Sequence, residues 1–130
     1  MTTQIKKTEW KGFFDNLSRD LDGWETRVEV FGYDMGAQVI SSGLPFHGLT
    51  VDEKEGAPTI ELRVGSGIKT HQTHNIPNVV KVEFEGRGVG PGGMLDIEDA
   101  KGTKTLIKFV QPFPVLVEYV NTEMVAIAVG

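Results

Sequence analysis

Glycine is crowded into residues 86–93, which read GRGVGPGG. Within this stretch, GVGPGG matches the G-x-G-x-x-G spacing of dinucleotide-binding turns, in which glycines let the backbone approach a pyrophosphate. That chemistry needs a helix to begin directly afterwards, because the amide donors of the helix meet the negative charge. Residues 94–98 instead alternate like a strand, and Pro91 removes one amide donor. We therefore expect a flexible, exposed loop outside any helix and bound to no nucleotide. A role for this loop as a lid is the alternative. Its glycines are Gly86, Gly88, Gly90, Gly92 and Gly93.

Histidine is the second residue type that could carry chemistry, because it titrates near neutral pH. His71 and His74 have H-x-x-H spacing, which places two side chains on one face of a helix but on opposite faces of a strand. Their β-branched neighbours favour a strand, so we do not expect this pair to chelate one metal ion. A zinc site formed through space by His47 and one of the other two histidines is the open alternative.

Paired acids are the third candidate. Asp96 and Glu98 alternate with apolar residues, so both fall on one face of a predicted strand. Two carboxylates there could hold a cation or divide acid and base roles. The simpler interpretation is the solvated face of a surface strand, as for Arg27, which lies between Glu25 and Glu29. The chain contains no G-x-S-x-G, P-loop or calcium-loop pattern.

Composition bounds the class of protein. The chain has 130 residues, of which 39% are hydrophobic and 24% charged, with net charge -5 and a pI near 5.1. This balance suits a single globular domain covering residues 1–130. An acidic surface repels phosphate backbones, so nucleic acid is not an expected partner. The absence of cysteine excludes disulfides and thiol catalysis. With no secretory or membrane-spanning segment visible, we expect a cytoplasmic protein and no membrane partner.

One helix is expected near the N-terminus of the chain. Apolar side chains recur at helical spacing along residues 8–22, which predicts an amphipathic helix that packs on a sheet. Thr8 is the expected N-cap, and Gly23 is expected in the left-handed conformation that ends the helix. The apolar stripe consists of Trp10, Phe13, Phe14, Leu17 and Leu21.

After Gly23 the apolar period changes from 3.6 to 2, which predicts strands. Ile60, Leu62 and Val64 should share one face of a strand, and Val80, Val82 and Phe84 should share one face of another. Pro77 should end a strand at a sheet edge. The predicted strands cover residues 24–31, 37–41, 46–52, 59–64, 70–76, 79–85, 94–98 and 103–110.

Short links join these strands, so neighbours must pair antiparallel. We expect an α+β fold in which the N-terminal amphipathic helix packs on a curled, mostly antiparallel sheet, or on a partly closed barrel, of about eight short strands. A tail covers residues 111–130, and its apolar run 115–120 fits either a strand or a short helix.

Several short motifs are spaced along most of the chain. They are Trp10-x-x-Phe13-Phe14, Ser18-Arg19, Gly23-Trp24, Val28-Glu-Val30-x-Gly32-x-Asp34-x-Gly36-Ala37-Gln38, Leu44-Pro45-x-x-Gly48, Thr73-His74-x-Ile76-Pro77 and Asp96-Ile-Glu-x-Ala100-x-Gly102-Thr103. Together they resemble a bacterial family of small proteins, the domain of unknown function 5335. The resemblance runs from about Trp10 to Phe109 and is densest over residues 23–38. It implies a small, soluble, bacterial stand-alone domain, and it implies no activity, cofactor or catalytic residue.

The residues therefore favour a non-enzymatic module that binds a small molecule or a protein, without a metal or other cofactor. The alternative is a small metabolic enzyme that uses a histidine as general acid or base. That enzyme would need His74 in a concave pocket within hydrogen-bond reach of a carboxylate or guanidinium group. A homodimer formed through the edge near Pro77 or through the apolar tail is a further alternative. The candidate ligand-binding residues are His74, Asp34, Arg63 and His47.

Overall fold

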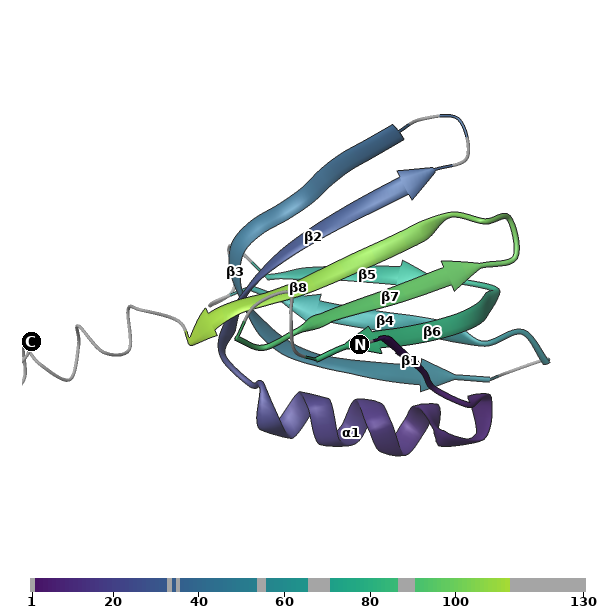
Figure 1. The fold of residues 1–130 in the computed structure, drawn as a ribbon, viewed down its shortest axis with the longest axis horizontal. Coiled ribbons are helices and arrows are strands. Elements are labelled where there is room, and N and C mark those ends of the chain that lie inside the picture. Colours follow the sequence, from purple (N-terminus) through teal and green to yellow (C-terminus); the bar gives the residue numbers. More distant parts are fainter. Residues whose placement is uncertain are drawn as a thin grey trace, which may run out of the picture.

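The computed structural model describes residues 2–32, 34, 36–53, 56–65, 71–86 and 91–112, and the predicted tail beyond Pro112 lies outside them. One short helix and eight strands make up the fold (Figure 1). They are β1 (Thr2–Gln4), a 3₁₀ helix (Lys7–Glu9), α1 (Trp10–Asp20), β2 (Trp24–Gly32), β3 (Gly36–Asp52), β4 (Thr59–Val64), β5 (Gln72–Ile76), β6 (Val79–Glu85), β7 (Met94–Asp99) and β8 (Lys104–Pro112).

All eight strands belong to one antiparallel sheet with the order β1-β6-β7-β8-β2-β3-β4-β5. The sheet curls, so that β4 and β5 lie behind β6, β7 and β8 (Figure 1). Among the described strands, β1 and β5 are the two edges and do not pair with each other, so no barrel closes. The predicted α+β class and antiparallel sheet are confirmed, and the barrel alternative is wrong. The strand β1 was not predicted, since three polar residues carry no apolar alternation.

The long strand β3 produces most of the curl. The sequence predicts two strands over residues 37–41 and 46–52, but the chain runs through both without a break. Register shifts interrupt its pairing near Ile40, Gly43 and His47, and such bulges bend a strand. At Pro45 the strand ends its pairing with β2, and it then continues beside β4. One strand therefore belongs to both layers of the sheet.

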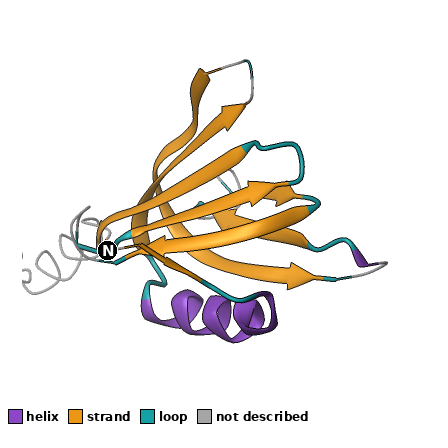
Figure 2. Ribbon diagram, turned by 45° about the vertical axis from the view of Figure 1, so that its right-hand side comes forward, coloured by secondary structure: helices purple, strands orange, loops and turns teal. Residues whose placement is uncertain are grey.

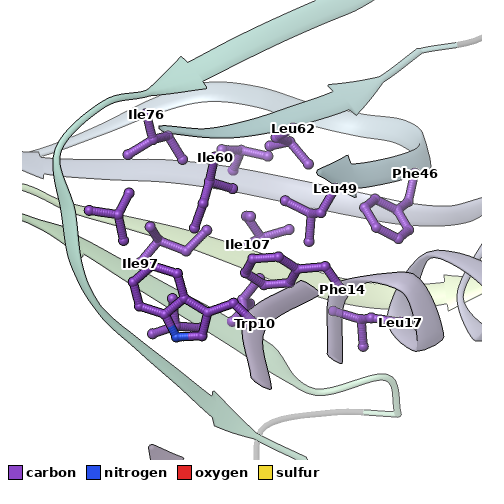
Figure 3. Close-up of a cluster of buried hydrophobic side chains, with 14 of the residues drawn as sticks. Trp10, Phe14, Leu17, Phe46, Leu49, Ile60, Leu62, Ile76, Ile97 and Ile107 are labelled. Carbon is purple, nitrogen blue, oxygen red and sulfur yellow. The ribbon is translucent and has the colours of Figure 1, made fainter. Parts of the chain in front are cut away.

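The helix α1 is amphipathic as predicted, and its apolar side chains point into the space between the two layers (Figure 3). Trp10, Phe14 and Leu17 are buried, and the Trp10 Nε1 donates a hydrogen bond to the Ile5 carbonyl over 2.9 Å. The N-cap prediction is wrong, because Thr8 lies within the 3₁₀ helix. Gly23 has a φ of 83°, the predicted left-handed conformation. The remaining core side chains come from both layers and include Phe46, Leu49, Ile60, Leu62, Ile76, Val82, Leu95, Ile97, Ile107 and Phe109.

Alternation along the strands matches the prediction except in β6. Ile60, Leu62 and Val64 are all fully buried. In β6 a register shift between Val79 and Lys81 turns Val80 outward, where 59% of it is exposed. The extra residue shifts the side-chain phase by one position, which the sequence pattern does not reveal.

The helix also covers a free strand edge. Beyond Pro45, β3 has β4 on one side only, and its other edge faces α1. The Leu49 N–H donates to the Ser18 Oγ over 3.0 Å, and the same hydroxyl donates weakly to the Leu49 carbonyl over 3.5 Å. The Gly23 N–H donates to the Phe46 carbonyl over 2.8 Å. We call this flank, along which α1 lies, the covered side of the sheet.

Candidate functional site

On the opposite flank of the curled sheet, between β5 and the β2–β3 hairpin, none of the described helices covers the sheet, and we call this flank the open side (Figures 1 and 2). The far end of the hairpin projects beyond the other strands there (Figure 2). A pocket of about 330 Å³ lies between these elements and the start of β8. It is lined by Val30, Ile40, Thr73, His74, Asn75, Ile76, Pro77, Thr103 and Thr105.

Strand register explains why these side chains meet. Val30 pairs with Thr105 on the inner face, and the buried Val28 pairs with Ser41. Glu29 pairs with Val39, so Ile40 has no partner in β2. A bulge of this kind places its extra side chain on the same face as the next residue. Ile40 therefore joins the inner face, where it lines the pocket.

Threonines make the inner face more polar toward the open side. Along β8 the inner positions run from Thr105, which is 5% exposed, to Ile107 and Phe109, which are fully buried. Thr103 precedes β8 and continues this row into the pocket. The pocket thus offers hydroxyl groups beside the aliphatic side chains of Val30 and Ile40.

His74 lies on the inner face of β5. It pairs with the buried Leu62, and directly opposed residues of antiparallel strands share a face. Its Nε2 is buried and has no hydrogen-bond partner in the part of the chain that the structure describes. Burial lowers the pKa of His74 below the ordinary value of 6.5, so the ring is neutral at physiological pH. A neutral imidazole has one donor and one acceptor nitrogen.

Two of the other predicted site residues do not join His74. Arg63 pairs with Thr73 and therefore lies on the outer face of β4, where its Nη1 is 3.5 Å from Glu61 Oε1. Asp34 is exposed at the turn of the β2–β3 hairpin, and it does not line the pocket. The sequence cannot separate these cases, because the face of each side chain follows from strand register.

His47 lies apart from the pocket, at the bulge where β3 begins to pair with β4. It is exposed, its Nδ1 is 4.0 Å from Asp22 Oδ1, and its ring is stacked on that of His71 with centroids 6.3 Å apart. His47 and His71 are therefore neighbours, and the zinc alternative requires His47 to lie close to one of the other two histidines. Among the described residues, however, no three histidine, aspartate or glutamate side chains form a group that could hold a metal ion.

The outer face of the sheet carries alternating charges rather than a cation site. The Arg27 Nε donates to Glu29 Oε2 over 2.6 Å, and this hydrogen bond lowers the pKa of Glu29. Lys104 Nζ is 3.8 Å from Asp96 Oδ2. Burial raises the pKa of Asp96, since its side chain is only 20% exposed. Asp96 is thus more enclosed than a solvated strand face implies.

The glycine stretch is packed where the structure describes it. The predicted exposure holds for Pro91 but is wrong for Gly93, which is buried, and for Gly92, which is half-buried. The Gly92 N–H donates to the Phe109 carbonyl over 3.2 Å, and the Phe109 N–H donates to the Gly93 carbonyl over 3.0 Å. A Cβ on Gly92 would lie 2.6 Å from Phe109 Cβ. Gly86 is half-buried, whereas Gly88 and Gly90 lie outside the described residues. The strand β7 follows directly, without the helix that a dinucleotide site needs.

Comparison with known proteins places the chain in a family. The protein family described as "Family of unknown function (DUF5335)" matches this chain over residues 1–115. The chain belongs to this family. The DUF5335 match confirms the resemblance seen in the sequence and extends beyond it at both ends, so that it includes β1.

A relative of this DUF5335 protein is an "Uncharacterized protein" of Aquifex aeolicus (strain VF5). The two are 31% identical over 115 residues, which cover 87% of this chain and 96% of the relative. No solved structure matches the chain. Within the described residues, neither helix is long and apolar enough to cross a membrane.

Proposed function

We propose that this DUF5335 protein binds a small uncharged molecule in the pocket on the open side and catalyses no reaction there. The observation that carries this proposal is the position of His74. Its ring lines a pocket of about 330 Å³, and its buried Nε2 has no partner among the described side chains and backbone groups. Buried polar atoms in proteins are nearly always hydrogen-bonded, so an unpartnered one beside a pocket supports a ligand site.

The lining of the pocket indicates the chemistry of the ligand. None of its nine residues carries an Asp, Glu, Lys or Arg side chain, and His74 is held neutral by burial. Placing an ion there would leave its charge without a partner, which is costly. Val30, Ile40 and Ile76 contribute apolar surface, while threonine hydroxyls and the imidazole contribute hydrogen bonds. A half-turn of the imidazole ring exchanges Nε2 with Cε1, and Nδ1 with Cδ2, at no change in shape, so a nitrogen can face the ligand.

The same geometry argues against the enzyme alternative. General acid–base catalysis by His74 would gain from a carboxylate or guanidinium group that orients or polarises the ring. In the described part of the chain, no ion pair or hydrogen bond joins His74 to such a group, and Arg63 lies on the other face of the sheet. Binding without turnover is the function that this arrangement supports best.

Native mass spectrometry of the protein purified directly from its host tests the proposal. The wild type should carry an additional mass that corresponds to an uncharged organic molecule. Ile40→Trp fills the pocket and should abolish this additional mass. Val39→Trp is the matched control, because Val39 directly precedes Ile40 in β3, lies on the outer face and is 49% exposed.

The comparison between the two variants decides the outcome. Retention of the bound mass by Val39→Trp and its loss from Ile40→Trp would support the pocket. An additional mass that survives equally in both variants would place the ligand elsewhere. A wild type that carries no additional mass, and that takes up no uncharged compound added to it, would contradict the proposal.

A further inference from the structure

The pocket touches five successive residues at the end of β5, residues 73–77. Successive side chains of a strand point to opposite faces, and here His74 and Ile76 face inward whereas Thr73 lies on the outer face with Arg63. A pocket that contacts both sets cannot lie on one face of the strand. It must run along the edge of β5, beside the backbone.

That edge carries backbone groups with no described strand beside them. Within the described part of the chain, β5 pairs with β4 alone and is the last strand of the sheet. Among the described residues, no backbone hydrogen bond outside the β4 ladder involves residues 72–76. In an antiparallel pair, every second residue directs its N–H and C=O away from its partner. The pocket wall along β5 is therefore a row of alternating donors and acceptors.

We propose that the ligand of this pocket is an extended, uncharged peptide segment that adds to β5 as a further strand. This inference rests on the proposed function and names the class of molecule that the site takes. An extended peptide presents the same alternation of donors and acceptors at every second residue, and peptides add to exposed sheet edges in this way. Its inward-facing side chain would then enter the pocket between His74, Ile40 and Thr105.

The opposite wall of the pocket favours a single strand over a second copy of the protein. Val30 and Ile40 of the β2–β3 hairpin, with Thr103 and Thr105, lie across the pocket from β5. A strand added to β5 occupies about 4.8 Å beside it, and the hairpin then stands in the way of further strands. The lack of charged lining side chains also favours side chains such as Val, Thr or Asn on the peptide.

The test uses a library of acetylated, amidated pentapeptides composed of Thr, Val, Ile, Asn and Ala, with backbone NMR of the full chain. We expect binding to shift the amide signals of residues 72–77 and to slow amide hydrogen exchange at every second residue of β5. The best binder is then made in two N-methylated forms, one at its odd and one at its even positions. Only one form should lose affinity, by about tenfold or more, because only one set of its amides faces β5.

Each outcome decides between distinct explanations. Equal effects of the two N-methylated forms, or shifts that bypass residues 72–77, would overturn strand addition. If uncharged fragments bind beside His74 but no peptide binds, the proposed function stands and this inference fails; if neither binds, both fail. A dimer in which alternate β5 amides are already protected without peptide would assign the edge to a second copy and overturn the proposal.

Discussion

The two flanks of the curled sheet differ in how a strand edge is treated. Among the described strands, β3 beyond Pro45 and β5 each pair with β4 on one side only. On the covered side, α1 lies against β3, and the Ser18 hydroxyl bonds to Leu49. On the open side, no described element pairs with the edge of β5, and a pocket runs along it. A bare edge invites association with other chains, so one that is left uncovered beside a pocket is a natural place for a ligand.

The side chains of the two flanks also differ in polarity and burial. Trp10, Phe14 and Leu17 fill the covered side with apolar surface that is at most 8% exposed (Figure 3). The open side presents Thr105, a neutral His74 and the half-buried Ile40. Stability should therefore depend on the covered side and binding on the open side.

Truncation of a side chain on each flank should give very different losses of stability. Phe14→Ala opens a cavity in the covered core and should lower the free energy of unfolding by about 3–5 kcal/mol. Ile40→Ala removes a half-exposed side chain beside an existing pocket and should lower it by about 1 kcal/mol or less. Urea denaturation at fixed pH measures both. Equal losses would show that the open side is part of the structural core.

Alanine substitution should have opposite effects at a packed glycine and at an exposed one. Gly92→Ala brings a methyl group within 2.6 Å of Phe109 Cβ and 2.9 Å of Trp24 Cζ3, so it should destabilise by about 1–3 kcal/mol. Gly12→Ala, on the exposed face of α1 with no atom within 4 Å, should stabilise by about 0.5–1 kcal/mol. Thermal unfolding of the two variants measures this contrast. A neutral Gly92→Ala would restore the interpretation of this stretch as a flexible, exposed loop.

Loss of the Ser18 hydroxyl tests how the covered edge is satisfied. Ser18→Ala leaves the Leu49 N–H without its acceptor and should lower the free energy of unfolding by about 1–2 kcal/mol. Ser42→Ala is the control, since Ser42 is exposed on β3 and should change stability by no more than about 0.5 kcal/mol. Hydrogen exchange at the Leu49 amide should also accelerate in Ser18→Ala alone. Unchanged exchange there would mean that α1 does not cap this edge.

The pH dependence of stability should report the burial of His74. The pKa of His74 is lowered in the folded state, so the unfolded chain binds the proton first as pH falls below 6.5. His74 therefore favours the folded state less and less between pH 6.5 and its lower folded-state pKa. We expect wild type to lose stability relative to His74→Gln on lowering the pH from 8 to 5. Parallel stability curves for the two proteins over this range would show that the ring is not buried.

Much of the fold can be predicted from local sequence patterns, whereas the site can be predicted only in part. The apolar stripe of α1, the alternation of β4 and the turn closed by Asp99 and Gly102 follow from local rules. In this turn the Gly102 N–H donates to the Asp99 carbonyl over 3.0 Å. Bulges are the main feature that the sequence does not predict. An extra residue such as Ile40 or Val80 alters which face of the sheet a side chain lies on without changing the composition of the strand.

Register accounts for the rest of the difference at the site. His74 could be nominated from its type and its neighbours, but its separation from Arg63 depends on which residues of β4 and β5 are opposed. The threonines of the pocket were missed. Their signal was the row Thr103, Thr105, Ile107 and Phe109, in which one face of a single strand changes from polar to apolar. Such a change marks the point at which a core meets a pocket or solvent.

The most direct test of the account is to locate binding by NMR with a library of small uncharged fragments. We predict that fragments shift the signals of His74, Ile40 and Thr105 in the wild type and in Val39→Trp, and that Ile40→Trp loses these shifts. Shifts that persist in Ile40→Trp, or that gather at the hollow formed by Pro58, Val79 and Val80 instead, would contradict the assignment of the open side as the ligand site.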